Sequence, residues 1–150
     1  MDILTQGVLG AATAQVFAPK EQAPKWAFLG AFGGLAPDLD VLIRSTSDPL
    51  LFLDYHRHFT HSLAFVPVGA ALVALVFSTV FKNRFQFNEI YLPCLLGYAT
   101  HGLLDACTSY GTLLLWPLSD ARIAWNVISI IDPLLTVPII ILMMMAMDLL

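Results

Sequence analysis

The sequence has few charged residues and no basic cluster, and these two shortages exclude whole classes of protein. Only 12% of its 150 residues are charged, 58% are hydrophobic, and the mean hydropathy is +0.77. This composition lies outside the range of soluble globular domains. The net charge is −4 and no run of Lys or Arg occurs, so no nucleic-acid partner is expected. We expect a single membrane-embedded domain over residues 1–150.

Cysteine is also scarce. Cys94 and Cys107 are the two cysteines, and they form no C-x-x-C motif. Neither a disulfide framework nor a zinc-thiolate site is therefore indicated. The N-terminus lacks the basic region of a signal peptide and places Asp2 before its first apolar stretch. We expect that first stretch to remain in the mature protein.

Apolar stretches, in contrast, are abundant, and they predict an all-α integral membrane bundle of about five helices. They cover residues 4–18, 26–35, 63–81, 90–104 and 127–147. Residues 63–81 hold no charge and are long enough to cross a hydrocarbon core of about 30 Å. Pro93 and Pro138 predict kinks, and some of the other helices are short.

The chain's histidines and several aspartates gather near the ends of these stretches. All four histidines lie within residues 56–61 or at position 101, and Asp38, Asp40, Asp105 and Asp132 stand nearby. Successive helices cross in opposite directions, so all these residues emerge on one membrane face. Basic residues slightly favour the short turns, with four there and three in the longer segments. This bias predicts that the shared face is the outer face of the membrane, on the periplasmic or extracellular side.

His101 and Asp105 are four residues apart, so on a helix they project from one face and could bind one metal ion. The alternative is a helix-end histidine beside a capping aspartate. In residues 56–62, His61 is the favoured ligand, while His56 and His58 compete for ligand and supporting roles. Thr60 is expected to cap the helix that follows. A solvated loop beside lipid headgroups is the alternative there.

Asp38 and Asp40 flank Leu39 after a proline, and in an extended segment their side chains would point to the same side. One would bind metal, and the other would bridge a second ion or orient a histidine. Ordinary turn chemistry is the alternative. Asp132 would pair with Arg122 or the metal site, or else cap a helix before Pro133. Arg57 suits a phosphate or carboxylate clamp, or an interfacial position.

A succession of motifs then resembles a known family. The motifs are MDILTQGVLGAA at the N-terminus, PDLD at 37–40, YHRHFTHS at 55–62, HGLLD at 101–105, YGTLLLWPLSD at 110–120 and IIDP at 130–133. They cover nearly the whole chain and resemble the YdjM-like family of bacterial membrane-bound metal-dependent hydrolases. That family is distantly similar to the superfamily of zinc-dependent phospholipase C and single-strand nucleases.

The resemblance implies a site, a cofactor and a location. It implies metal ligation by Asp38, His61, His101 and Asp105, with His56 and Asp40 next, most simply to Zn²⁺. Many relatives have histidine where this chain has Gln6. Relatives often continue into a further domain, so the expected alternatives are the N-terminal part of a longer member and a minimal version of the family. The implied location is the bacterial inner membrane.

These observations predict a membrane-bound hydrolase. A metal-activated water would cleave a phosphoester of a lipid or lipid-linked substrate, with Asp40 or Asp132 taking its proton and Arg57 assisting. The alternatives are a metal-binding or transport protein without catalysis, and a structural membrane subunit. Transport would need polar groups deep within residues 63–81 and 127–147, where few occur.

Overall fold

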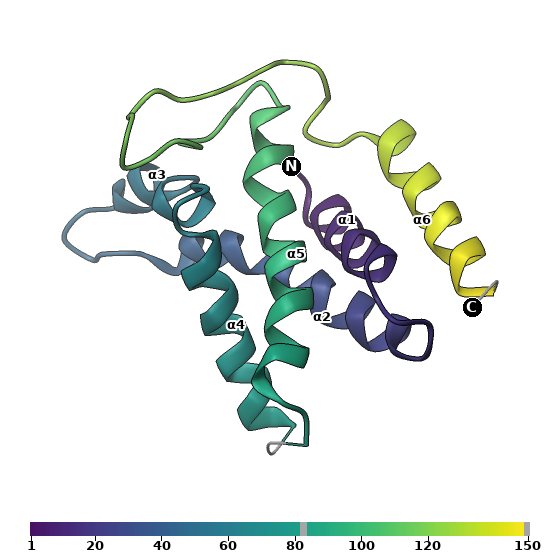
Figure 1. Cartoon of the computed structure of the whole chain (residues 1–150). Coiled ribbons are helices and arrows are strands. Elements are labelled where there is room, and N and C mark those ends of the chain that lie inside the picture. The colour runs from purple at the N-terminus through teal and green to yellow at the C-terminus, as the bar shows by residue number, and fades with distance from the viewer. Residues whose placement is uncertain (82–83, 149–150) are drawn as a thin grey trace.

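The computed structural model describes residues 1–81 and 84–148, which form six α-helices and no sheet (Figure 1). The helices are α1 (Ile3–Val16), α2 (Ala23–Leu35), α3 (Leu51–Tyr55), α4 (Val66–Val80), α5 (Phe87–Ala106) and α6 (Pro133–Asp148). Three 3₁₀ segments join them: η1 (Lys20–Gln22), η2 (Ala36–Leu42) and η3 (Phe59–His61). The all-α prediction is confirmed.

Helix α5 occupies the centre and packs against α1, α2 and α4. Its approach to α2 requires glycine, because a methyl group on Gly97 would collide with the backbone of Gly30. On its other side, small residues of α4 such as Ala70 and Ala74 are fully buried against it. Figure 1 shows α4 and α5 lying side by side. This packing holds the last turns of α5 beside the start of η2.

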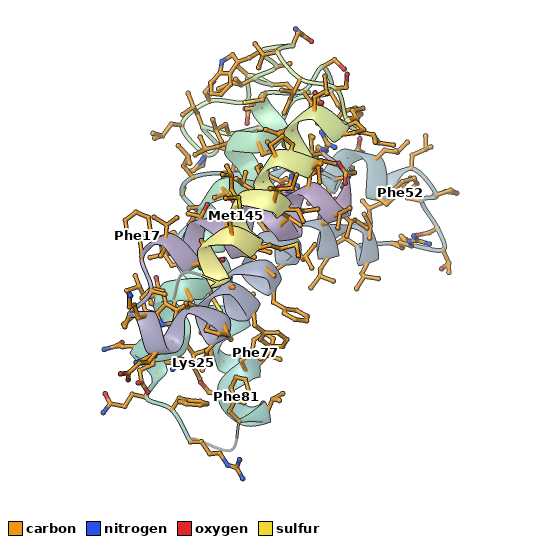
Figure 2. The ribbon with its side chains drawn as sticks, turned by 90° about the vertical axis from the view of Figure 1, so that its right-hand side faces the viewer. Phe17, Lys25, Phe52, Phe77, Phe81 and Met145 are labelled. Atoms are coloured by element: carbon orange, nitrogen blue, oxygen red, sulfur yellow. The ribbon has the colours of Figure 1, made fainter. Side chains whose placement is uncertain are left out.

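Helix α6 lies apart from this core. Among the described helices it packs mainly against α1, and in Figure 2 it lies nearest the viewer, marked by Met145. A long segment, residues 107–132, crosses one end of the molecule to reach it (Figure 1). A backbone bridge between Thr112 and Ile123 folds this segment back on itself, and Leu113 N donates to Arg57 O outside it. The hydrogen bond from Asp2 N to Ile130 O also anchors it.

The structure changes several predicted boundaries. A sixth helix, α3, lies in the segment that the sequence assigned to a loop, and residues 127–132 precede α6 rather than belong to it. Thr60 does not cap α4, which begins at Val66. Asp38 and Asp40 lie in the 3₁₀ segment η2 rather than in an extended segment. The apolar stretches predicted the long helices, but tertiary hydrogen bonds determine these short connections.

Length and apolarity identify one candidate membrane crossing. The prediction that residues 63–81 form one membrane-crossing helix is not confirmed, because α4 covers only Val66–Val80. No single described helix is both long and apolar enough to cross a bilayer alone. Two consecutive helical parts, Leu51–His61 and Val66–Val80, are long and apolar enough when taken together, and they meet at an angle of 95°. His61 therefore stands at the bend of the pair.

Candidate metal centre

Four side chains from three separate segments converge at the bend, and we call them the ligand cluster: Asp38, His61, His101 and Asp105. Asp38 comes from η2, His61 from η3, and the other two from the last turns of α5. Both histidines and Asp105 have fully buried side chains, and only Asp38 reaches the surface, with its side chain 22% exposed. The prediction that these four residues meet is confirmed.

The spacing of the cluster fits a tetrahedral metal ion. The Nε2 atoms of His61 and His101 are 2.9 Å apart. The four distances from these nitrogens to Asp38 Oδ1 and Asp105 Oδ2 run from 3.2 to 3.5 Å. Four bonds of about 2.0–2.2 Å in a tetrahedron place the ligand atoms about 3.3–3.6 Å apart. Four of the six separations are therefore close to those of a zinc site, the two nitrogens are closer together, and the two carboxylates lie within 4.8 Å.

An unpaired oxygen gives a second indication of fit. Asp105 Oδ2 is buried and accepts no hydrogen bond from any described residue, and its contact with Arg57 Nε is a long ion pair of 3.4 Å. A buried carboxylate oxygen without a partner is costly, unless it binds a cation. The same atom faces the Nε2 atoms of His61 and His101. The residues present thus fit a divalent metal, whose identity the donor set alone leaves open.

The orientation of His101 directs a lone pair into the cluster. Its Nδ1 lies 2.5 Å from the carbonyl oxygen of Gly34, in the last turn of α2. Carbonyls in the last turn of a helix have no partner within the helix, so this oxygen is free to accept. Because a carbonyl oxygen cannot donate, Nδ1 carries the proton and Nε2 is left as a metal ligand.

His61 is oriented in the same way by a carboxylate. Its Nδ1 lies 3.0 Å from Thr60 Oγ1 and 3.3 Å from Asp40 Oδ2. Asp40 also accepts hydrogen bonds from the Thr60 hydroxyl and the Arg57 backbone N–H, and its Oδ1 lies 2.8 Å from His56 Nδ1. Asp38 and Asp40 therefore contact opposite nitrogens of His61. Carboxylates behind a ligating histidine fix its tautomer and increase its basicity.

The carboxylates of η2 are held in their charged form. Burial raises the pKa of Asp38, but its favourable contacts with His101 and His61 outweigh this effect and hold the pKa well below its usual range. Asp40 shows the same balance, with His56 and His61 as the partners that lower its pKa. Both groups are thus ionised at neutral pH, as a metal ligand and a histidine-orienting group must be.

Asp105 is surrounded by further donors. The amino group of Met1 contacts its Oδ1, and Gln6 Nε2 donates to the same oxygen at 3.1 Å. Arg57 Nε lies 3.4 Å from Oδ2, and its guanidinium lies over the ring of Tyr110. The backbone of Arg57 has a φ of 60°, in the left-handed region. The hydrogen bond from its N–H to Asp40 helps to hold this unusual conformation.

The remaining predicted residues lie outside the ligand cluster. His56 contacts Asp40 and reaches the surface, with its side chain 23% exposed. His58 packs beside Trp116. Asp132 caps α6 by accepting a hydrogen bond from Leu134 N–H, which is the helix-cap alternative, while Arg122 donates to the carbonyl of Gly111. The catalytic role of Asp132 stays a prediction without any described contact to the cluster.

Sequence reasoning did not assign the supporting residues. Gly34 contributes only a backbone carbonyl, which no side-chain motif can reveal. Thr60 was assigned to a helix cap from its local pattern, whereas its hydroxyl donates to Asp40, which is distant in sequence. The comparison of Gln6 with histidine in relatives was the one signal available, since it marked position 6 as a site position. Gln6 is fully buried beside Asp105.

Comparison with known proteins identifies the family of the chain. A family model described as YdjM inner membrane protein matches residues 1–149. The chain belongs to the YdjM inner membrane protein family. The resemblance found in the motifs is thereby confirmed, and so is the location in the bacterial inner membrane. The family description names no activity.

Two curated relatives of this YdjM family chain can be compared in length. Inner membrane protein YbcI of Escherichia coli (strain K12) is 35% identical over 115 residues, which are 71% of this chain and 63% of YbcI. Uncharacterized protein YfhP of Bacillus subtilis (strain 168) is 28% identical over 101 residues, 67% of this chain and 30% of YfhP. The chain thus spans less than two thirds of either relative. No solved structure matches it.

Proposed function

We propose that the chain is a membrane-bound, metal-dependent hydrolase that cleaves a phosphoester of a lipid or lipid-linked substrate. The observation that carries this proposal is the ligand cluster, in which two histidine nitrogens and two carboxylate oxygens face one point at tetrahedral spacing. Zn²⁺ is the metal that this donor set suits best. When bound, it would supply a Lewis acid for water activation and for charge on a phosphoryl oxygen.

The residues around the cluster suit the remaining tasks of such a reaction. Asp40 holds His61 and His56 together, which favours a positioning role for this carboxylate. His56 combines a carboxylate partner with an exposed edge, and its ring centre lies 6.1 Å from that of His61. We therefore assign proton transfer to the Asp40–His56 pair. Arg57 would balance the charge of a phosphate that approaches beside Asp38.

Hydrolysis by the purified protein tests this proposal. The protein would be extracted in detergent, freed of metal with a chelator and reloaded with Zn²⁺, Mn²⁺ or Fe²⁺. Methyl 4-nitrophenyl phosphate and phosphatidylcholine vesicles would serve as substrates. We expect turnover only with metal, and none in a His101→Ala variant. Turnover that survives chelation or this substitution would contradict the proposal, and so would a metal-loaded protein that cleaves neither a phosphodiester nor a lipid.

A second candidate function is metal binding without catalysis. The observation in its favour is that the chain supplies four ligands, three of them fully buried, as closed structural zinc sites do. A structural metal would tie η2, η3 and α5 together. In that case chelation would lower the melting temperature while no phosphoester would be hydrolysed, and the His56→Ala variant would keep full stability.

A further inference from the structure

An apolar groove runs along α4 and ends at Asp40 and Thr60, which contact His61 of the ligand cluster. Its outer part is a hollow of about 450 Å³ between α2, η2 and α4, lined by apolar side chains that include Phe32, Val76 and Phe77. Its inner part, of about 310 Å³, is nearer to the start of α4. The two parts share Leu39 and Val73 in their walls, so they adjoin.

The inner part brings the groove to the residues that support the ligand cluster. Asp40 and Thr60 are the polar side chains in its wall, and both contact His61. Leu39, which lines both parts, stands between Asp38 and Asp40 in η2. The groove is therefore apolar along most of its length and polar at the end where Asp40 and Thr60 lie.

The walls of the groove are too exposed and too apolar for a surface in water. Leu39 is 62% exposed, Val76 is 59% exposed and Leu72 is 55% exposed. Patches of this kind mark binding sites for apolar partners. Because the family resides in the inner membrane, hydrocarbon chains are the apolar groups that surround it. The bend of 95° lets a molecule lie along α4 while its polar end turns toward His61.

We propose that this groove binds one acyl chain of a phosphorylated lipid, with the phosphate directed to the metal centre. The phosphate rests on the proposed function, whereas the acyl chain rests on the groove itself. From Gly69 to Phe77 the groove follows α4 for about 12 Å. In Figure 2, Phe77 and Phe81 lie far from the segment 107–132, which crosses the opposite end. The acyl chain thus runs away from the face that carries the ligands.

The dimensions distinguish an acyl chain from a protein partner. A helix with its side chains is about 10 Å across and would cover the hollows rather than enter them. A phosphorylated lipid, in contrast, is thin along its hydrocarbon chain and polar at one end, as the groove is. Binding would position the phosphoester and select long-chain over short-chain substrates.

Two exposed wall residues allow a direct test. Leu72→Trp would fill the inner part and Val76→Trp the outer part, and both positions are exposed enough to accept the larger side chain. Leu75→Trp is the matched control, because Leu75 also lies on α4 and is 53% exposed but lines neither part of the groove. The first measurement is retention of hexadecyl phosphate or methyl phosphate by the purified protein, detected by native mass spectrometry.

We expect wild type and Leu75→Trp to retain one hexadecyl phosphate per chain, and the two groove variants to bind it about tenfold or more weakly. Methyl phosphate should show no such difference. Equal retention by all four proteins would overturn the proposal. A chain dimer that Val76→Trp dissociates would do so too, since a second copy would then cover the groove.

The second measurement is hydrolysis of hexadecyl and methyl 4-nitrophenyl phosphate. In the groove variants, kcat/KM for the hexadecyl diester should fall about tenfold or more, whereas kcat/KM for the methyl diester should stay unchanged. If wild type cleaves neither diester, the proposed hydrolase fails, while lipid retention still decides the groove. If wild type cleaves the methyl diester but retention is unaffected by the groove variants, the groove fails and the hydrolase stands.

Discussion

Two regions of this apolar protein contain buried polar groups. In one region the groups hydrogen-bond to a partner, and in the other they face a shared point. Between α1 and α6, the hydroxyls of Thr5 and Thr136 are 2.6 Å apart and satisfy one another, and Gln15 Nε2 donates to Met143 O. In the ligand cluster, Asp105 Oδ2 and two histidine nitrogens face a common point instead. Hydroxyl pairs of the first kind hold helices together. Lone pairs that converge, in contrast, indicate a cation site.

Removal of a metal ligand should produce the largest difference between the two regions. We expect His101→Ala to lose metal affinity by at least about a hundredfold, since even supporting residues contribute about 10–100-fold. Elemental analysis and metal titration of the purified protein would measure this. His58→Ala is the matched control, because His58 packs beside Trp116 outside the cluster. Equal metal content in both variants would remove the distinction between the two regions.

Asp40→Asn tests the layer behind the ligands. The amide keeps the shape of the carboxylate but loses the charge that His61 and His56 face. We expect metal affinity to fall by about 10–100-fold, with the ligands still in place. Asp132→Asn serves as the control, because asparagine caps a helix as well as aspartate does. If Asp132→Asn weakened metal binding as much as Asp40→Asn, the positioning role of Asp40 would be wrong.

Gly102→Ala tests whether the ligand cluster depends on the close packing of η3 against α5. A methyl group at this position would collide with the carbonyl oxygen of His61 and push η3 away from α5. We expect a loss of about 1–3 kcal/mol in stability, together with weaker metal binding. Gly7→Ala is the control, since its methyl group would make ordinary contact with Leu35. Thermal unfolding of both variants, with and without metal, would measure the effect, and equal melting temperatures would contradict it.

The smallest effect is expected in the other region. Thr136→Val removes one hydroxyl of the pair between α1 and α6, which should cost about 0.6 kcal/mol and leave metal binding unchanged. Thr79→Val is the comparison, because the Thr79 hydroxyl bonds within α4 to Val76 O. Hydrogen exchange of α6 would report the loosening. Loss of metal from Thr136→Val would show that the two regions are coupled rather than separate.

The sequence allowed the long helices and the ligand cluster to be predicted for definite physical reasons. Alternating helix directions place the ends bearing Asp38, His61, His101 and Asp105 on one side, and that argument needs no coordinates. The supporting contacts escape it, because the carbonyl of Gly34 has no side-chain signature. Thr60 was assigned to a cap by local pattern, while its real partner Asp40 lies twenty residues away.

X-ray absorption at the metal edge of the purified wild-type protein tests the central claim most directly. The account predicts one metal per chain with a shell of nitrogen and oxygen neighbours at about 2.0–2.2 Å, and imidazole scattering that disappears in part in His101→Ala. A protein without stoichiometric metal after reconstitution would contradict it. A shell dominated by sulfur at about 2.3 Å would do the same, since Cys94 and Cys107 lie outside the ligand cluster.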